Sequence, residues 1–178
     1  MTPVHVFTSA DEAELFINGK SQGKQKRAPF AYRFRWDYTV YEPGEVKVVT
    51  WKQGQPWATQ TVTTTGAAAA LSVDTDRSRI AGDGRDLVFV TVRVQDAKGR
   101  TTPTASNTIR FTVSGPGELI ATDNGDPTSF IPFPSATRPA FNGLALAIVR
   151  ARPGAKGAIT VGAQSDGLAH GTITLTAR

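Results

Sequence analysis

One short run of the sequence has the residue types of a serine hydrolase. Residues 19–23, GKSQG, match the pattern G-x-S-x-G, which places a nucleophilic serine on a sharp turn between a strand and a helix. No helical periodicity follows Gly23, and a hairpin turn accounts for the glycines. The only histidines, His5 and His170, are expected in different domains, so no general base is available to Ser21. We therefore expect a turn here rather than a nucleophile.

Other reactive side chains also lack a catalytic arrangement. Residues 19–21 resemble the end of a Walker A motif, but Glu14 stands where that motif needs a glycine. The two carboxylates of a retaining glycosidase lie ~5–5.5 Å apart in a deep cleft, whereas Glu42 and Glu45 flank a Pro-Gly turn and Glu118 opens a strand-like run. The chain has no cysteine, which removes thiolate chemistry and sulfur-bound zinc. The sequence therefore predicts no catalytic residue and no cofactor.

Oxygen-rich aspartate pairs could bind calcium, which takes carboxylate and carbonyl ligands. The same residue types satisfy backbone hydrogen bonds in ordinary turns, so turns are the first prediction. A calcium site in the DNGD run stays as the alternative, with Asp123 and Asp126 as its candidate ligands. The pairs occur at three places: Asp74 and Asp76, Asp83 and Asp86, and Asp123 and Asp126.

Aromatic residues gather in the first third of the chain, where exposed rings could stack against sugars or buried rings could fill a core. Trp36 and Trp51 lie in strand-like runs and are expected in a core or at an interface. Trp57 lies in a polar region, residues 55–57, that we expect to be a turn, so its ring is expected to be exposed. The candidate carbohydrate-binding residues are Trp57, Trp36 and Tyr38.

Short β-type runs are the elements that would position these side chains. In the first part of the chain Asn18-Gly19 predicts a type I′ hairpin turn, because both central residues of that turn need positive φ. In the second part the clearest run is 87–95, where alternate valines share one face. The predicted strands cover residues 4–7, 14–17, 32–36, 45–51, 59–64, 71–74, 87–95, 109–113, 118–122, 144–149, 158–163 and 172–177.

The order of these runs predicts an all-β protein with two consecutive small β-sandwiches, the second of them immunoglobulin-like. Residues 66–70, GAAAA, are small and show no periodicity, which indicates a linker. The predicted domains are therefore residues 1–66 and residues 67–178.

Charge and hydropathy limit the partners. The formal charge is +5, but basic residues are interleaved with acidic ones and only residues 24–27 cluster, so we do not expect nucleic-acid binding. No apolar run reaches membrane-spanning length, and no signal peptide precedes the first strand-like run. We expect a soluble chain that does not bind a membrane.

The first half carries a family resemblance. Residues 4–23, VHVFTSADEAELFINGKSQG, followed by YRFRWD at 32–37 and YEPGE at 41–45, resemble the small β-sandwich module that follows the catalytic barrel in bacterial glycoside hydrolase family 2 β-galactosidases. The fold implied for this part is an accessory β-sandwich.

The second half resembles the C-terminal immunoglobulin-like module of the same enzymes, through residues 78–92, SRIAGDGRDLVFVTV, residues 123–129, DNGDPTS, and residues 140–150, AFNGLALAIVR. The catalytic glutamates of that family lie in a (β/α)₈ barrel, and no position of this chain corresponds to them. The resemblance implies a non-catalytic accessory region of an exported sugar-degrading enzyme, located in the periplasm or outside the cell, with the barrel as its partner.

Three functions follow as hypotheses. The first is a pair of modules that brace the barrel or mediate domain or oligomer contacts. The second is a pair of carbohydrate-binding modules, and the third is a repeat of a surface adhesin. The proline-rich loop within residues 111–150 carries Phe130, Phe133 and Phe141, and we expect it to pack back on its own sandwich or against a neighbouring domain.

Overall fold

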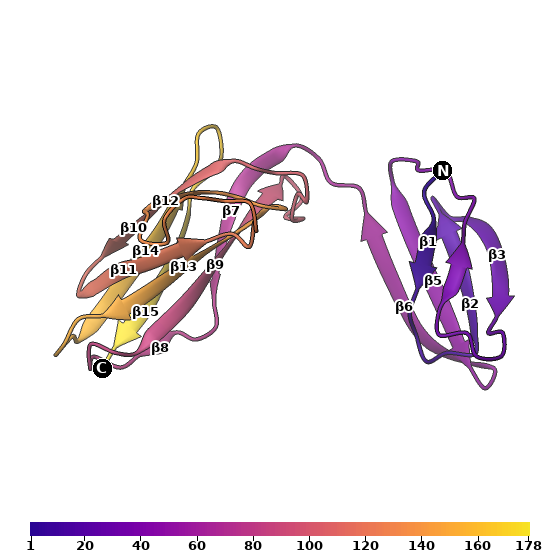
Figure 1. The fold of residues 1–178 in the computed structure, drawn as a ribbon, viewed down its shortest axis with the longest axis horizontal. Helices are drawn as coiled ribbons and strands as arrows, with labels where there is room; N and C mark the ends of the chain where they lie inside the picture. Colours follow the sequence, from indigo (N-terminus) through magenta and orange to yellow (C-terminus); the bar gives the residue numbers. More distant parts are fainter. The chain divides into compact units, whose positions relative to one another are not determined.

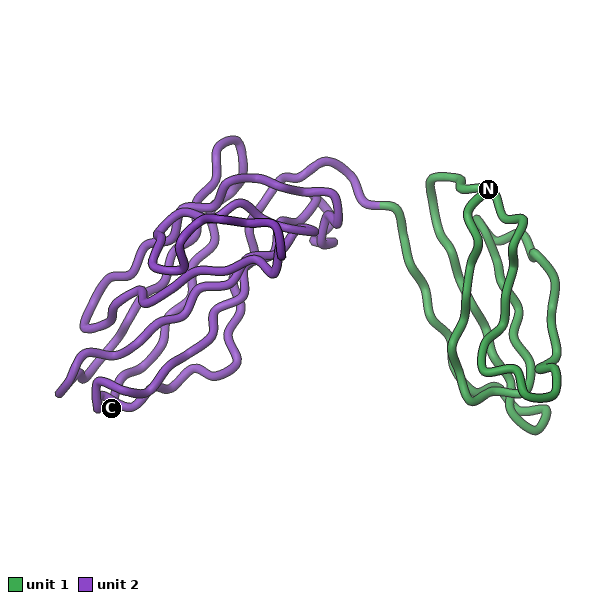
Figure 2. The backbone as a smooth tube through the Cα atoms, in the orientation of Figure 1, with its two compact units in different colours: residues 1–64 green, residues 65–178 purple.

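A computed structural model describes all 178 residues, which divide into two compact units, residues 1–64 and residues 65–178 (Figure 2). Both units are built from strands alone (Figure 1). No helix in the fold is long and apolar enough to cross a membrane.

The first unit, residues 1–64, is a small sandwich of two antiparallel sheets. A four-stranded sheet has the order β3-β2-β5-β6, and a two-stranded sheet pairs β1 with β4. Buried residues alternate along the strands, and Leu15, Phe34 and Trp36 from both sheets form the centre of its core. The strands are β1 Val4–Val6, β2 Glu12–Ile17, β3 Lys20–Lys26, β4 Phe34–Trp36, β5 Glu45–Lys52 and β6 Gln55–Thr63.

Two tight turns set the register of the four-stranded sheet. Asn18 and Gly19 have φ of 48° and 77°, as the predicted type I′ turn between β2 and β3 requires. Gln53 and Gly54, with φ of 51° and 76°, make the equivalent turn between β5 and β6. The prediction of a turn at residues 55–57 is therefore wrong, because the chain has already reversed before Gln55. Trp57 lies within β6 instead.

The second unit, residues 65–178, is a larger sandwich of a four-stranded sheet, β11-β13-β9-β7, and a five-stranded sheet, β12-β10-β14-β15-β8. The expectation of an immunoglobulin-like sandwich is confirmed, with two short strands, β8 and β12, added to the predicted set. The strands are β7 Ala68–Thr75, β8 Arg79–Ile80, β9 Leu87–Asp96, β10 Thr108–Ser114, β11 Gly117–Asp123, β12 Thr137–Pro139, β13 Leu144–Ala151, β14 Gly157–Gln164 and β15 Gly171–Ala177.

The core of the second unit lies between its two sheets. The alternating valines of β9, from Val88 to Val94, are fully buried, as the sequence predicts. They belong to one cluster with Ile109 of β10, Ile159 of β14 and Leu175 of β15. Burial of each such side chain contributes about 1.5–3 kcal/mol, so this cluster is the main source of stability in the unit.

The prediction of a linker at residues 66–70 is wrong, because these residues belong to the second unit and most of them lie in β7. The carboxylate of Asp96 accepts a hydrogen bond of 2.8 Å from the backbone N–H of Gly66. Ala68 to Ala70 form the beginning of β7 and pair with β9. Their small side chains give no periodic signal, and the pairing with a distant strand decides their conformation.

Candidate functional site

Ser21, the only candidate nucleophile from the sequence, is tied into its own hairpin. Its Oγ donates a hydrogen bond of 2.6 Å to Glu14 Oε1 and accepts one of 3.1 Å from the N–H of Gly23. His5 lies on β1 of the first unit and His170 directly precedes β15 of the second. Ser21 therefore stabilises the hairpin between β2 and β3, and no histidine is placed to act as its general base.

The candidate carbohydrate-binding rings do not form one platform. Trp36 is buried in the core and its Nε1 donates a hydrogen bond of 3.1 Å to the Gly23 carbonyl oxygen. Tyr38 is 84% exposed in the loop after β4, and Trp57 is 54% exposed on β6. The Lys52 ammonium lies 4.8 Å from the centroid of the Trp57 ring. Trp57 is thus exposed, as expected, but a cation of the same chain already contacts its ring.

The basic run at residues 24–27 makes contacts within the chain. Lys24 and Lys26 reach the carboxylate of Glu12 at 2.7 and 3.8 Å, and the hydrogen bond from Lys24 lowers the pKa of Glu12. The guanidinium of Arg27 donates to the carbonyl oxygens of Ala10, at 2.8 Å, and Thr8. These contacts hold the β3 edge of the first unit.

The DNGD run forms turns through its own side chains. Asp123 Oδ1 accepts hydrogen bonds from the N–H groups of Asn124 and Gly125, at 2.7 and 3.3 Å. Asp126 Oδ1 accepts from the N–H and the hydroxyl of Thr128, which lowers the pKa of Asp126. No group of three or more metal-ligating His, Cys, Asp or Glu side chains occurs in the structure. These hydrogen bonds are the ones expected of a turn, which is the first prediction for this run.

A buried arginine organises the loop that connects β11 to β12, residues 124–136. Arg138 is 1% exposed and has no carboxylate partner. Its Nε and Nη2 donate to Thr122 Oγ1 and Thr122 O, at 3.2 and 2.6 Å. Nη1 and Nη2 also donate to the carbonyl oxygens of Ile131 and Pro132, both at 2.9 Å. The loop backbone is therefore held from inside by Arg138, together with a hydrogen bond of 2.8 Å from the N–H of Thr122 to the carbonyl oxygen of Phe133.

This loop presents apolar side chains to solvent. Phe130 is 98% exposed, Phe133 62% and Ile131 38%. The expectation is that the loop packs on its own sandwich or against a neighbouring domain. The second alternative stays a prediction, and the first is wrong for Phe130 and Phe133. The reason is that the loop carbonyl groups face inward to Arg138, which turns the side chains outward. We call Phe130, Ile131 and Phe133 the loop patch.

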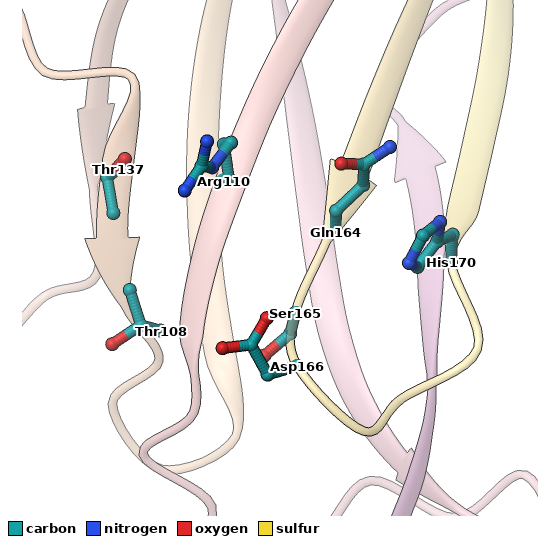
Figure 3. Close-up of a pocket in the computed structure, with 7 residues that line it drawn as sticks. All are labelled: Thr108, Arg110, Thr137, Gln164, Ser165, Asp166 and His170. Atoms are coloured by element: carbon teal, nitrogen blue, oxygen red, sulfur yellow. The ribbon is translucent and has the colours of Figure 1, made fainter.

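A polar hollow lies on the outer face of the five-stranded sheet and has a volume of about 310 Å³ (Figure 3). Arg110 of β10 has Thr137 of β12 and Gln164 of β14 as its direct cross-strand partners. Sequence reasoning missed this site, although alternation along β10 places Arg110 on the outer face. The lining residues are Thr108, Arg110, Thr137, Gln164, Ser165, Asp166 and His170.

The chemistry of this hollow suits binding and not hydrolysis. Asp166 is its only carboxylate, whereas glycosidic cleavage by the usual mechanism uses two. Its other lining groups are a guanidinium, an amide, an imidazole and hydroxyls, which donate and accept hydrogen bonds.

Comparison with known protein families gives two matches, in order along the chain. Residues 71–174 match the family described as "Glycoside hydrolase family 2 C-terminal domain 5". Residues 1–58 match a family described only as a domain of unknown function, DUF4982.

The similar proteins are glycosidases much longer than this chain. Beta-galactosidase BoGH2A of Bacteroides ovatus is 38% identical over 171 residues, which is 96% of this chain and 20% of that protein. A beta-glucuronidase of Formosa agariphila is 32% identical over 115 residues, which is 64% of this chain and 12% of that protein.

The similar solved structures are also glycosidases much longer than this chain. A glycosyl hydrolase family 2 member from Bacteroides cellulosilyticus has a TM-score of 0.94 and 29% identity, covering 99% of this chain and 23% of that one. A beta-glycosidase from Bacteroides vulgatus has a TM-score of 0.90 and 26% identity, covering 98% and 22%. This chain thus spans less than a quarter of the length of each relative. With a family match over more than half of its residues, the chain belongs to the glycoside hydrolase family 2 C-terminal domains.

Proposed function

We propose that this chain is the non-catalytic accessory region of a family 2 β-galactosidase, and that it braces the catalytic (β/α)₈ barrel through domain contacts. The proposal is supported by the loop patch, which combines apolar side chains with a backbone fixed by Arg138. The activity of the parent enzyme is inferred from BoGH2A, which is named a beta-galactosidase.

A fixed apolar loop leaves its side chains exposed to water until another surface covers them. Exposed Phe130 and Phe133 are unfavourable in water, and Pro132 and Pro134, which flank Phe133, limit the conformations the loop can adopt. Apolar patches that a rigid backbone holds in place mark sites of protein contact. Little ordering entropy is lost when such a patch docks. A neighbouring domain of the parent enzyme is the proposed occupant.

The decisive experiment compares thermal unfolding in two settings. The double variant Phe130→Ser, Phe133→Ser should lower the melting temperature of the whole parent enzyme by several degrees and leave that of the 178-residue chain within about 1 °C, because the rings touch little within the chain. Phe30→Ser, an exposed phenylalanine of the first unit, is the matched control. An unchanged melting temperature of the parent enzyme would contradict the bracing role.

A second measurement tests the absence of catalysis. The 178-residue chain alone should not hydrolyse a chromogenic β-galactoside above the buffer rate, because no position of the chain corresponds to the catalytic glutamates of the family and the hollow around Arg110 has a single carboxylate, Asp166. Turnover by the purified chain that persists after rechromatography would overturn the accessory role.

The location of the parent enzyme is also a proposal. Family resemblance favours the periplasm or the cell exterior. Fractionation of cells that express the parent enzyme, followed by immunoblotting with an antibody raised against this chain, tests it. Recovery in the cytoplasmic fraction would contradict the location.

A further inference from the structure

The hollow of Figure 3 is built on a sheet and not on a mobile loop. Thr137, Arg110 and Gln164 form one row across three adjacent strands, each directly opposite the next. His170 directly precedes Gly171, the first residue of β15 and the cross-strand partner of Ala163, and so lies at the β15 end of the row. Side chains directly opposite in antiparallel strands have Cβ atoms ~4.5–5.5 Å apart. The spacing of these polar groups is therefore set by the sheet.

A second set of polar groups borders the row. Figure 3 shows Thr108, Ser165 and Asp166 below the row of Thr137, Arg110, Gln164 and His170. Thr108 lies on the same face of β10 as Arg110, two residues earlier, and Ser165 and Asp166 directly follow β14. The hydroxyl-bearing Ser165 is buried, at 9% exposure, although it lines an open hollow. The two sets enclose the space from two sides.

The charged groups of the hollow are not paired with each other. Arg110 and Asp166 both line it, yet neither takes part in an ion pair within the chain. Elsewhere in the same unit Arg77 pairs with Asp86, and Arg100 with Asp96. A ligand in the hollow would therefore meet an available guanidinium donor and an available carboxylate acceptor.

These groups together define the class of ligand. Arg110 and Asp166 line the same hollow, so a simple anion would be repelled by the Asp166 carboxylate and a simple cation by the Arg110 guanidinium. Hydroxyl groups donate and accept, and can satisfy both at once. A volume of about 310 Å³ lies at the lower end of ligand sites, which fits one ring rather than a chain. We propose that this hollow, centred on Arg110 and Asp166, binds a neutral sugar residue through its hydroxyl groups.

The proposal is independent of the bracing role, which concerns the loop patch. No Phe, Tyr or Trp ring lines the hollow, so binding depends mainly on hydrogen bonds and is expected in the millimolar range. Such a site would retain sugar units of a polymer near a parent enzyme and would not hold a free monosaccharide tightly.

The test is a titration of the ¹⁵N-labelled 178-residue chain, followed by two-dimensional NMR, with methyl β-D-galactoside, methyl β-D-glucoside and methyl β-D-glucuronide in separate series. At least one neutral glycoside should shift the amide signals of residues 108–110 and 164–171 in a saturable manner. Arg110→Met and Asp166→Asn should each weaken that binding at least tenfold. Because both positions are exposed, both variants should keep the melting temperature of the unsubstituted 178-residue chain.

The matched control is Arg152→Met, which removes an exposed arginine from the loop between β13 and β14 and should leave the binding unchanged. Three results would overturn the proposal: no saturable shift of these signals with either neutral glycoside, undiminished binding in both hollow variants, or binding of the glucuronide alone. The last result would make the hollow an anion site.

Discussion

At the scale of single residues, Arg138 explains how a long loop keeps one conformation. A buried charge without a carboxylate partner is costly unless all of its donors are satisfied. Here the guanidinium donates to the carbonyl oxygen of Thr122 on β11, to two carbonyl oxygens within the loop, and to the hydroxyls of Thr122 and Ser129. Arg138 thus adds a set of internal hydrogen bonds to the few backbone bonds that residues 124–136 make with the strands.

Arg138→Met should lower the free energy of unfolding of the second unit by about 3 kcal/mol, because several buried carbonyl oxygens lose their donors. Urea unfolding, followed by circular dichroism, measures it. Arg138→Lys keeps the charge but supplies fewer donors in a different geometry, and should give an intermediate loss. A loss below about 0.5 kcal/mol for Arg138→Met would show that the loop does not depend on these bonds.

Asp96 gives the second unit a dependence on acid pH. Its buried carboxylate accepts hydrogen bonds from the Arg100 side chain and from the backbone of Gly66, Arg100 and Lys98, which hold its pKa far below the usual 3.8. A carboxyl group whose pKa is lower in the folded state than in the unfolded state stabilises the fold at any pH above its unfolded-state pKa. This stabilisation is lost progressively as the pH falls from the unfolded-state pKa towards the folded-state pKa.

We therefore expect the melting temperature of the second unit to fall as the pH drops below about 4. Asp96→Asn should lower it at pH 7 and flatten this acid dependence. Asp74→Asn, at an exposed aspartate of the same unit, is the control and should leave both unchanged. An acid profile of Asp96→Asn that matches the unsubstituted chain would contradict this role. Calorimetric scans between pH 2.5 and pH 7 make the comparison.

At the scale of elements, the first unit is held at one end by contacts between two of its turns. Asn18, in the turn between β2 and β3, accepts a hydrogen bond from the N–H of Glu45 at 2.8 Å and donates to Pro43 O at 3.2 Å. Gly44 lies between these partners with φ of 141°. A Cβ at this position would lie 1.9 Å from Asn18 Oδ1. The close approach therefore requires glycine.

Gly44→Ala should destabilise the first unit by about 2 kcal/mol, through backbone strain and displacement of the Asn18 side chain. Gly23→Ala is the control, since Gly23 also has positive φ but a Cβ there meets nothing within 4 Å; it should cost about 1 kcal/mol. Adding Asn18→Ala should reduce the effect of Gly44→Ala to that of the control. Equal losses of stability for Gly44→Ala and Gly23→Ala would show that the contact between a Cβ at position 44 and Asn18 contributes nothing.

At the scale of the whole molecule, the two units have separate cores of unequal size. The core of the first unit contains few buried side chains, centred on Leu15, Phe34 and Trp36, whereas that of the second joins residues from most of its strands. A domain of about 60 residues buries only about 60% of the surface of its unfolded chain, and its stability is correspondingly small.

Scanning calorimetry should therefore show two transitions, with the first unit unfolding at the lower temperature. Removing residues 1–64 should abolish the lower transition and leave the upper one in place, because the second unit keeps its complete core. A single transition that shifts on truncation would show that the units depend on each other for stability.

The sequence by itself determined most of the strands and the tight turn between β2 and β3. Alternation along β9 and the Asn18-Gly19 pair are local signals, because the direction of each side chain in a strand and the φ of a turn residue depend on near neighbours. Family resemblance added the C-terminal region of a family 2 glycoside hydrolase, which the family match over residues 71–174 confirms, and the accessory role stays a proposal. The predicted strands were right where periodicity was strong and wrong at Ala68–Ala70, where small side chains carry no pattern.

Only the tertiary structure decided which distant residues meet. Arg110 and Gln164 are separated by more than fifty positions and become neighbours only through the register of β10 and β14. Arg138 is charged, a type that is exposed in most proteins, and its burial follows from the carbonyl groups that the loop turns inward. Register and burial depend on contacts across the whole sandwich, and for that reason no local pattern could reveal them.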